Sequence, residues 1–154
     1  MSAILSASPA TDLEALLQAR LHDPFRYLGL HHEGAKWVLR VFHPHADAIA
    51  LRTGSGHEPL ERVHPAGLFE WYGVEAPPAP YVLALSEGGS VRDRHDPYAF
   101  VPALSGHDLY LFNEGRLRQA WRTLGSHLEQ RNGVHGVRFA CASTRTLCPE
   151  HGLA

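Results

Sequence analysis

The sequence predicts a mainly β fold: an antiparallel, immunoglobulin-like β-sandwich with an N-terminal helix and a C-terminal linker helix. Two observations favour it. Five or six short segments with β-type patterning recur about every ten residues between residues 36 and 94, and glycine- and proline-containing turns separate them. Helical periodicity occurs only in the segments on either side.

Length and composition exclude several classes of protein. The chain has 154 residues, 44% of them hydrophobic and 19% charged, which is typical of a globular domain. No apolar stretch approaches the roughly 18 residues of a membrane-spanning helix. A (β/α)₈ barrel needs roughly 200–250 residues, so a complete enzyme of that class is not expected. The net charge of −2 argues against nucleic-acid binding. The first residues lack a basic region ahead of apolar ones, which favours a cytoplasmic protein.

Residues 1–21 are expected to form a flexible start followed by a short amphipathic helix. Thr11 and Glu14 are spaced as a capping box, with Thr11 as the N-cap. One face of this helix carries Leu13, Leu16, Leu17 and Leu21. The helix is expected to end before Asp23-Pro24, because the residue before a proline avoids helical geometry.

Residues 22–105 are predicted to form the sandwich. Apolar residues alternate from Lys36 to Phe42, until Pro44 interrupts the pattern. A hairpin is expected around Pro65-Ala66-Gly67. The further predicted strands are 48–52, 60–64, 68–72, 81–85 and a weaker edge strand, 90–94.

Residues 106–127 are predicted to be a linker with a helix from Asn113, its N-cap, to Leu124, and Gly125 suits the C′ position. Residues 128–154 are expected to contain the truncated start of a second sandwich. A strand without partners is predicted within 134–140, and the tail after it has no convincing period.

Three groups of metal-ligating residues are present, and none makes a strong site. His43 and His45 would project from one face of a strand end and could grip a metal, although a composition with twelve histidines produces such pairs by chance. Cys141, Cys148 and His151 do not have the spacing of a common zinc knuckle. The adjacent His31 and His32 would point apart. We therefore expect no metal and no cofactor.

Catalytic residues are not apparent either. Paired carboxylates for glycoside chemistry would have to come from Glu70, Glu75, Asp93 or Asp96, and the sequence gives no reason to pair them. The aromatic pair Trp71 and Tyr72 is the candidate binding site, because adjacent residues of a strand point to opposite faces. One ring would then face the core and the other solvent, where it could stack on a sugar; core filling is the competing interpretation.

Seven ordered blocks resemble the N-terminal region of bacterial 1,4-α-glucan branching enzymes of the glycogen-branching type. They cover about residues 20–140. The blocks are His22-Asp23-Pro24-Phe25 with Leu28-Gly29-Leu30-His31, then 39–46, 60–70, Asp96-Pro97-Tyr98-Ala99-Phe100, 108–115, Leu124-Gly125-Ser126-His127 and 133–140.

This resemblance implies a place in glycogen biosynthesis. In that family an accessory β-sandwich and a linker precede a glucan-binding sandwich and a catalytic barrel. The barrel is a retaining glycosyltransferase that transfers α-1,4-glucan segments to form α-1,6 branches without a metal or cofactor. The accessory domain is thought to assist substrate docking. No catalytic carboxylate of the barrel has a counterpart here, so the chain is expected to be inactive alone, with α-glucan and the missing catalytic domain as its partners.

The match stops abruptly after Ala140, where the family continues differently. This departure, with both cysteines beyond it, suggests a tail translated in a shifted reading frame. Two alternatives stay open: a stand-alone module that binds α-glucan or another protein, and a histidine-dependent metal protein.

Overall fold

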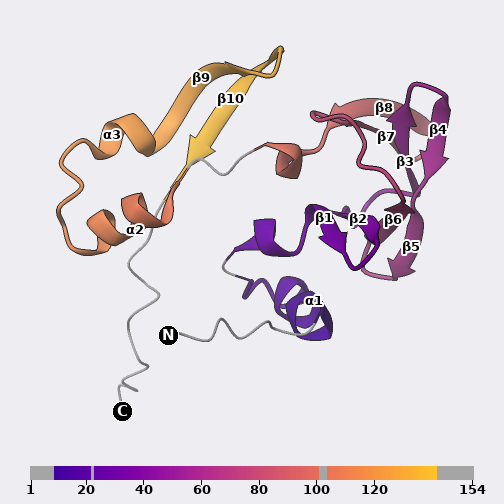
Figure 1. Cartoon of the computed structure of the whole chain (residues 1–154), viewed down its shortest axis with the longest axis horizontal. Coiled ribbons are helices and arrows are strands. Elements are labelled where there is room, and N and C mark those ends of the chain that lie inside the picture. Colours follow the sequence, from indigo (N-terminus) through magenta and orange to yellow (C-terminus); the bar gives the residue numbers. More distant parts are fainter. Residues whose placement is uncertain (1–8, 22, 101–103, 142–154) are drawn as a thin grey trace. The chain divides into compact units, whose positions relative to one another are not determined.

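Figure 1 shows the computed structural model, which describes residues 9–21, 23–100 and 104–141. The chain divides into two compact units, one within residues 1–100 and the other within residues 101–154. The first unit contains α1 (Pro9–Leu17), η1 (Pro24–Arg26), β1 (Gly29–Glu33), β2 (Lys36–Phe42), β3 (Ala48–Thr53), β4 (Gly56–Pro59), β5 (Glu61–His64), β6 (Leu68–Gly73), β7 (Val82–Glu87), β8 (Ser90–His95) and η2 (Pro97–Ala99). The second unit contains α2 (Gly106–Asn113), α3 (Ala120–Thr123), β9 (Gly125–Arg131) and β10 (Val134–Ala140).

The first unit is a sandwich of two antiparallel four-stranded sheets. The first sheet has the order β1-β2-β6-β5 and the second sheet the order β4-β3-β7-β8. Alternate residues of both sheets point into one shared core, which includes Leu39 on β2, Phe69 on β6, Leu51 on β3 and Leu83 on β7. The predicted mainly β, antiparallel sandwich with an N-terminal helix is therefore confirmed.

The outer face of the first sheet is partly covered by the N-terminal segment. Leu13, Leu16 and Leu21 pack against a small cluster of Tyr27, Leu28 and Leu68. Asp12 accepts two hydrogen bonds from the Arg26 guanidinium, at 2.7 and 3.0 Å, which joins α1 to η1. The apolar stripe predicted for this helix is thus used for packing on the sheet.

The boundaries of α1 differ from the prediction. The helix begins at Pro9, so Thr11 is inside it and is not the N-cap. It ends at Leu17, and Ala19 with φ of 53° turns the chain away. The left-handed residue, rather than the later Asp23-Pro24, terminates the helix.

Most of the predicted strands are confirmed, and the edge position of 90–94 is confirmed as well, because β8 pairs only with β7 in the described part of the chain. Three strands were not predicted. β1 contains two adjacent histidines, β4 is the short segment Gly56–Pro59, and β9 in the second unit occupies Gly125–Arg131.

In the second unit the predicted helix 113–124 is wrong. Asn113 is the last residue of α2, and Gly115 with φ of 65° reverses the chain. Only α3 is helical in the remainder of that range. The predicted strand within 134–140 is confirmed as β10, but it has a partner, since it pairs with β9 along its whole length.

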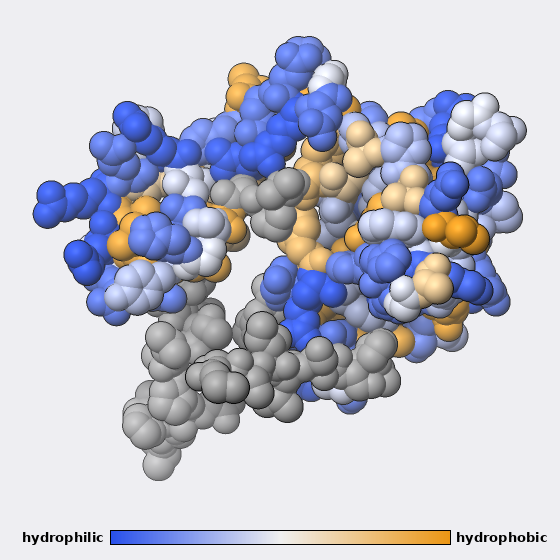
Figure 2. Space-filling model, in the orientation of Figure 1, coloured by the Kyte–Doolittle hydropathy of each residue, from blue (hydrophilic) through white to orange (hydrophobic). Residues whose placement is uncertain are grey.

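The surface mixes hydrophilic and hydrophobic residues on the face shown in Figure 2. None of the described helices is long and apolar enough to cross a membrane.

Candidate functional site

Trp71 and Tyr72 lie on opposite faces of β6, as the alternation predicted. Trp71 points inward, where it packs against the core, and its indole nitrogen donates a hydrogen bond to Glu58 Oε2 at 2.8 Å. Tyr72 points outward and is 52% exposed. The prediction that one ring faces the core and the other faces solvent is confirmed, and Tyr72 is the ring that a ligand can reach.

The position of the Trp71 indole depends on Gly73, two residues along the same face. A Cβ atom at Gly73 would lie 2.0 Å from the Trp71 ring. Glycine at this position therefore leaves room for the indole beside the strand. The Trp71 indole consequently lies at the margin of the core, where it is partly buried.

Beside Tyr72 the first sheet carries a charged network centred on Arg40. This guanidinium lies on β2, directly across from Glu70 of β6. It donates to Glu70 Oε1 at 2.8 Å and to both carboxylate oxygens of Glu33 on β1, at 2.7 and 3.1 Å. The Tyr27 ring lies against the guanidinium, 4.9 Å from centroid to Cζ. Three strands and the N-terminal segment thus meet at one cation.

Burial and hydrogen bonding act in opposite directions on the pKa of Arg40. Burial disfavours the charged guanidinium, but the bonds to Glu33 and Glu70 outweigh it and raise the pKa of Arg40. The hydrogen bond from Arg40 lowers the pKa of the Glu33 carboxyl. Glu33 is therefore an ionised acceptor, the opposite of what a general acid requires.

Tyr72 is tied to the same network. Its hydroxyl donates to Glu70 Oε2, and this bond raises the pKa of Tyr72 to about 12. The ring is therefore neutral at physiological pH and held in one orientation. We call the exposed surface formed by Tyr72, Glu70 and Glu33 the Tyr72 face. An aromatic ring beside carboxylate acceptors can hold a ligand that is rich in hydroxyl groups.

The predicted metal ligands are not brought together. β2 ends at Phe42, so His43 and His45 lie in the following turn rather than on one face of a strand. His31 Nε2 contacts the Leu28 carbonyl, whereas the His32 ring packs edge-on against Trp37. No group of three or more His, Cys, Asp or Glu with metal-binding geometry exists within residues 9–21, 23–100 and 104–141. Cys141 is exposed and free, and Cys148 and His151 lie outside the described residues.

The carboxylates considered for glycoside chemistry have separate structural tasks. Asp93 pairs with Arg52 at 2.6 Å, and Glu70 belongs to the Arg40 network. Asp96 is buried and caps η2, where it accepts from the Tyr98 amide and the Tyr81 hydroxyl. Glu75 is exposed after β6.

Arg40 is the central residue that the sequence reasoning missed. A usable signal existed, because an arginine in the middle of the otherwise apolar run Val38-Leu39-Arg40-Val41-Phe42 must find partners if the strand is covered on both faces. Its partners are 7 and 30 residues away along the chain, and only the strand register brings them together.

The first unit is thus a β-sandwich with an exposed aromatic ring and carboxylate acceptors on the outer face of one sheet. Comparison with known proteins specifies its family. Residues 9–98 match the family described as alpha-1,4-glucan branching enzyme GlgB, N-terminal domain. The chain therefore belongs to the family of branching-enzyme N-terminal domains.

Individual relatives agree with this assignment. Over 133 residues the chain is 55% identical to the 1,4-alpha-glucan branching enzyme GlgB of Nitrosospira multiformis. The matched segment covers 83% of this chain and 18% of that enzyme. The enzyme of the same name from Methylobacillus flagellatus is 52% identical, over 82% of this chain and 18% of the enzyme. The one from Nitrosomonas eutropha is 47% identical, over 91% of this chain and 20% of the enzyme. The chain thus spans about a fifth of the length of these curated relatives.

Proposed function

We propose that this chain serves as the glucan-docking accessory part of a 1,4-α-glucan branching enzyme and performs no chemistry itself. The observation that carries the proposal is Tyr72, an aromatic ring that is half exposed on a strand and fixed by Glu70 in a protein of this family. The catalytic domain of such an enzyme is its expected partner, and an α-glucan such as glycogen or a malto-oligosaccharide is its expected ligand.

The geometry favours a sugar over other flat ligands. The apolar ring face of a glucose unit can lie on the Tyr72 ring, while its hydroxyl groups donate to the carboxylates of Glu33 and Glu70. Glu33 is 46% exposed and Glu70 only 12% exposed, so Glu33 offers the accessible oxygens. Because Arg40 fixes both carboxylates, little side-chain entropy would be lost on binding.

A titration with maltoheptaose followed by NMR tests this assignment. We expect saturable shifts at residues of β1, β2 and β6, and we expect Tyr72→Ala to weaken binding at least about tenfold. Tyr110→Ala is the matched control, because Tyr110 is 55% exposed on α2. Equal effects of the two substitutions, or no binding by the parent chain, would refute the proposal.

The non-catalytic role has a separate test. Incubation of the chain with amylose is expected to produce no α-1,6 linkages, measured after debranching. The appearance of new branches would overturn it. Addition of the remaining region of the Nitrosospira multiformis relative tests whether activity depends on that region.

The second unit suggests where further polypeptide would dock. Leu128, Val137 and Phe139 lie on one face of the β9–β10 hairpin, and they are 88%, 61% and 73% exposed. The opposite face carries Arg138, which donates to the Thr123 carbonyl and to Glu129. We propose that this apolar face begins the second, glucan-binding sandwich (residues 128–154) and is covered by the rest of the enzyme. Leu128→Ser with Phe139→Ser should abolish association with the separately produced remainder of the relative, and Tyr110→Ser should not.

We also place the protein in the cytoplasm. The exposed free thiol of Cys141 supports a reducing compartment. Fractionation of cells that express a tagged chain tests this, and recovery from the periplasm would contradict it.

A further inference from the structure

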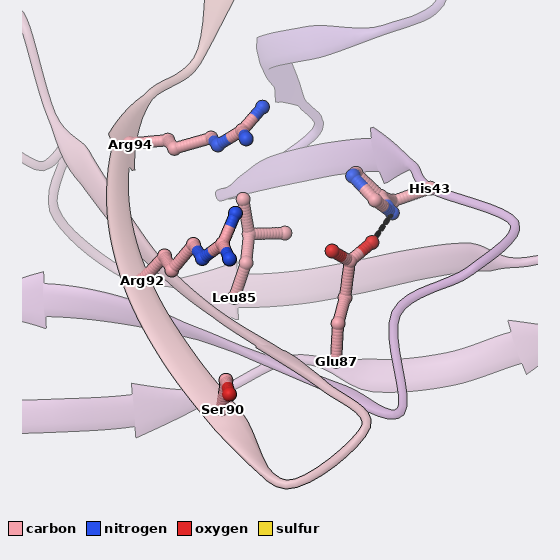
Figure 3. Close-up of a pocket in the computed structure, with 6 residues that line it drawn as sticks. All are labelled: His43, Leu85, Glu87, Ser90, Arg92 and Arg94. Atoms are coloured by element: carbon pink, nitrogen blue, oxygen red, sulfur yellow. Dashed lines mark ion pairs between the residues drawn. The ribbon is translucent and has the colours of Figure 1, made fainter.

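A small polar recess lies between the two sheets at their β8 side, away from the Tyr72 face. Figure 3 shows its lining residues, which come from two parts of the fold. Leu85 and Glu87 belong to β7 and Ser90, Arg92 and Arg94 to β8, whereas His43 follows the end of β2 in the other sheet.

The β8 residues face the recess because of the strand register. Ser90 is paired with Glu87, Arg92 with Leu85 and Arg94 with Leu83, so these three residues lie on the side of the second sheet that faces the core. Both guanidiniums extend toward the space in which His43 and Glu87 meet (Figure 3). Neither guanidinium makes an ion pair or hydrogen bond within the part of the chain that the structure describes.

His43 is fixed opposite them. Its amide donates to the Gly67 carbonyl at 2.7 Å, and Gly67 itself packs against the His43 and Pro44 backbone. His43 Nδ1 is buried and has no hydrogen-bond partner in the described residues. It lies 3.4 Å from Glu87 Oε1, a contact that is an ion pair only when the imidazole is protonated.

The recess therefore combines two cations without partners, a hydroxyl, an imidazole with an unused nitrogen, and a single carboxylate. We propose that it binds a phosphate group. Guanidinium forks match the tetrahedral oxygens of phosphate, and two arginines two residues apart on one strand can grip the same anion. Ser90 and His43 supply further donors from the rim and from the other sheet. Two arginines exceed the single charge of Glu87, so the charges that line the recess favour an anion.

Isothermal titration of the whole chain with inorganic phosphate at fixed ionic strength tests the proposal. We expect saturable binding to one site. Arg92→Ala and Arg94→Ala should each weaken it at least about tenfold, because each removes a charged hydrogen-bond donor. Arg118→Ala is the matched control, an exposed arginine of the second unit, and should leave the affinity unchanged.

A further titration with glucose 6-phosphate identifies the source of the phosphate. Equal affinity for inorganic phosphate and glucose 6-phosphate would mean that the phosphate group alone is recognised, and tighter binding of glucose 6-phosphate would identify a sugar phosphate. Absence of binding, or equal losses in the Arg92, Arg94 and Arg118 variants, would overturn the proposal. Because the maltoheptaose titration monitors the opposite sheet, failure of one proposal leaves the other standing.

Discussion

Arg40 is buried in the centre of β2 with a side chain that is only 7% exposed, and two carboxylates neutralise it. A buried cation of this kind is costly unless its hydrogen bonds are satisfied. Here Glu33 and Glu70 satisfy the guanidinium from strands on either side. The same contacts fix the register of β1, β2 and β6 and orient the acceptors beside Tyr72.

Removal of this guanidinium should destabilise the sandwich strongly. Arg40→Met leaves the nearly buried carboxylate of Glu70 without its cationic partner, and we expect a loss of about 3–5 kcal/mol in the free energy of unfolding. Arg52→Met removes an exposed pair with Asp93 and should cost at most about 1 kcal/mol. Urea unfolding of both variants measures the difference. Similar losses would show that the Arg40 network is not desolvated.

Asp96 is the second buried charge that shapes stability. Burial raises the pKa of Asp96, although the hydrogen bonds from Tyr81 and the Tyr98 amide oppose the shift. A carboxyl whose folded pKa is raised contributes most stability below its unfolded pKa, about 3.9, and this contribution is lost as pH rises through the folded value. The ionised form is thus the less favourable one in the fold.

The raised pKa of Asp96 predicts how the stability of the Asp96→Asn variant depends on pH. The variant keeps a similar shape and cannot ionise, so its stability relative to the parent chain should increase as pH rises from about 4 to 7. Urea midpoints across that range measure it. Asp93→Asn, at an exposed ion pair, should show no such gain. A difference that is constant with pH would contradict the raised pKa.

At the scale of elements, the turn between β5 and β6 is tightly constrained by the β2–β3 connection. Gly67 has φ of 100°, and a Cβ atom there would lie 2.5 Å from both the His43 carbonyl oxygen and the Pro44 Cα. These are backbone atoms, so relief requires movement of the β2–β3 connection. The sequence correctly predicted a hairpin here, but the close approach to Pro44 depends on tertiary packing.

Gly67→Ala should therefore reduce the stability of the fold clearly more than the same substitution in a glycine turn with open space around it. Gly89 between β7 and β8 has φ of 80° and open space around its Cβ position. We expect Gly89→Ala to lower the free energy of unfolding by about 1 kcal/mol because of backbone strain. Gly67→Ala should lower it by at least about 2 kcal/mol more. Thermal unfolding compares the two, and equal losses would show that the turn relaxes freely.

Elements with apolar β-type patterning were predictable, and those defined by their neighbours were not. β2, β3 and β6 each place apolar residues on the face that points into the core, whereas β1 (Gly-Leu-His-His-Glu) and β4 (Gly-His-Glu-Pro) acquire extended structure by pairing with β2 and β3. The helix expected from Asn113 failed because Gly115 adopts a left-handed conformation that ends α2. The opposed orientations of Trp71 and Tyr72 follow from strand geometry alone. The Arg40 network needs contacts between neighbouring strands of one sheet, and the recess needs contacts between the two sheets.

At the scale of the whole molecule, histidine dominates the response to acid. The chain has twelve histidines, a net charge of −2 with these neutral, and a pI near 6.6. Imidazoles protonate near pH 6.5, so mild acidification adds many positive charges. Electrophoretic mobility should reverse sign between about pH 7.5 and 5.5. A mobility that stays negative throughout this interval would mean that most of the imidazoles remain neutral in the fold.

The two ends of the sandwich have related sequences and meet in space. Asp23-Pro24 and Asp96-Pro97 each start a 3-10 turn with an aspartate N-cap, and Phe25 and Tyr98 from these turns pack edge to face at 5.0 Å. Tyr98 also lies against Gly29 at the start of β1. The polypeptide consequently enters and leaves the sandwich at one corner. Such a domain can be transplanted as a cassette, because a host loop can receive both of its ends without being stretched.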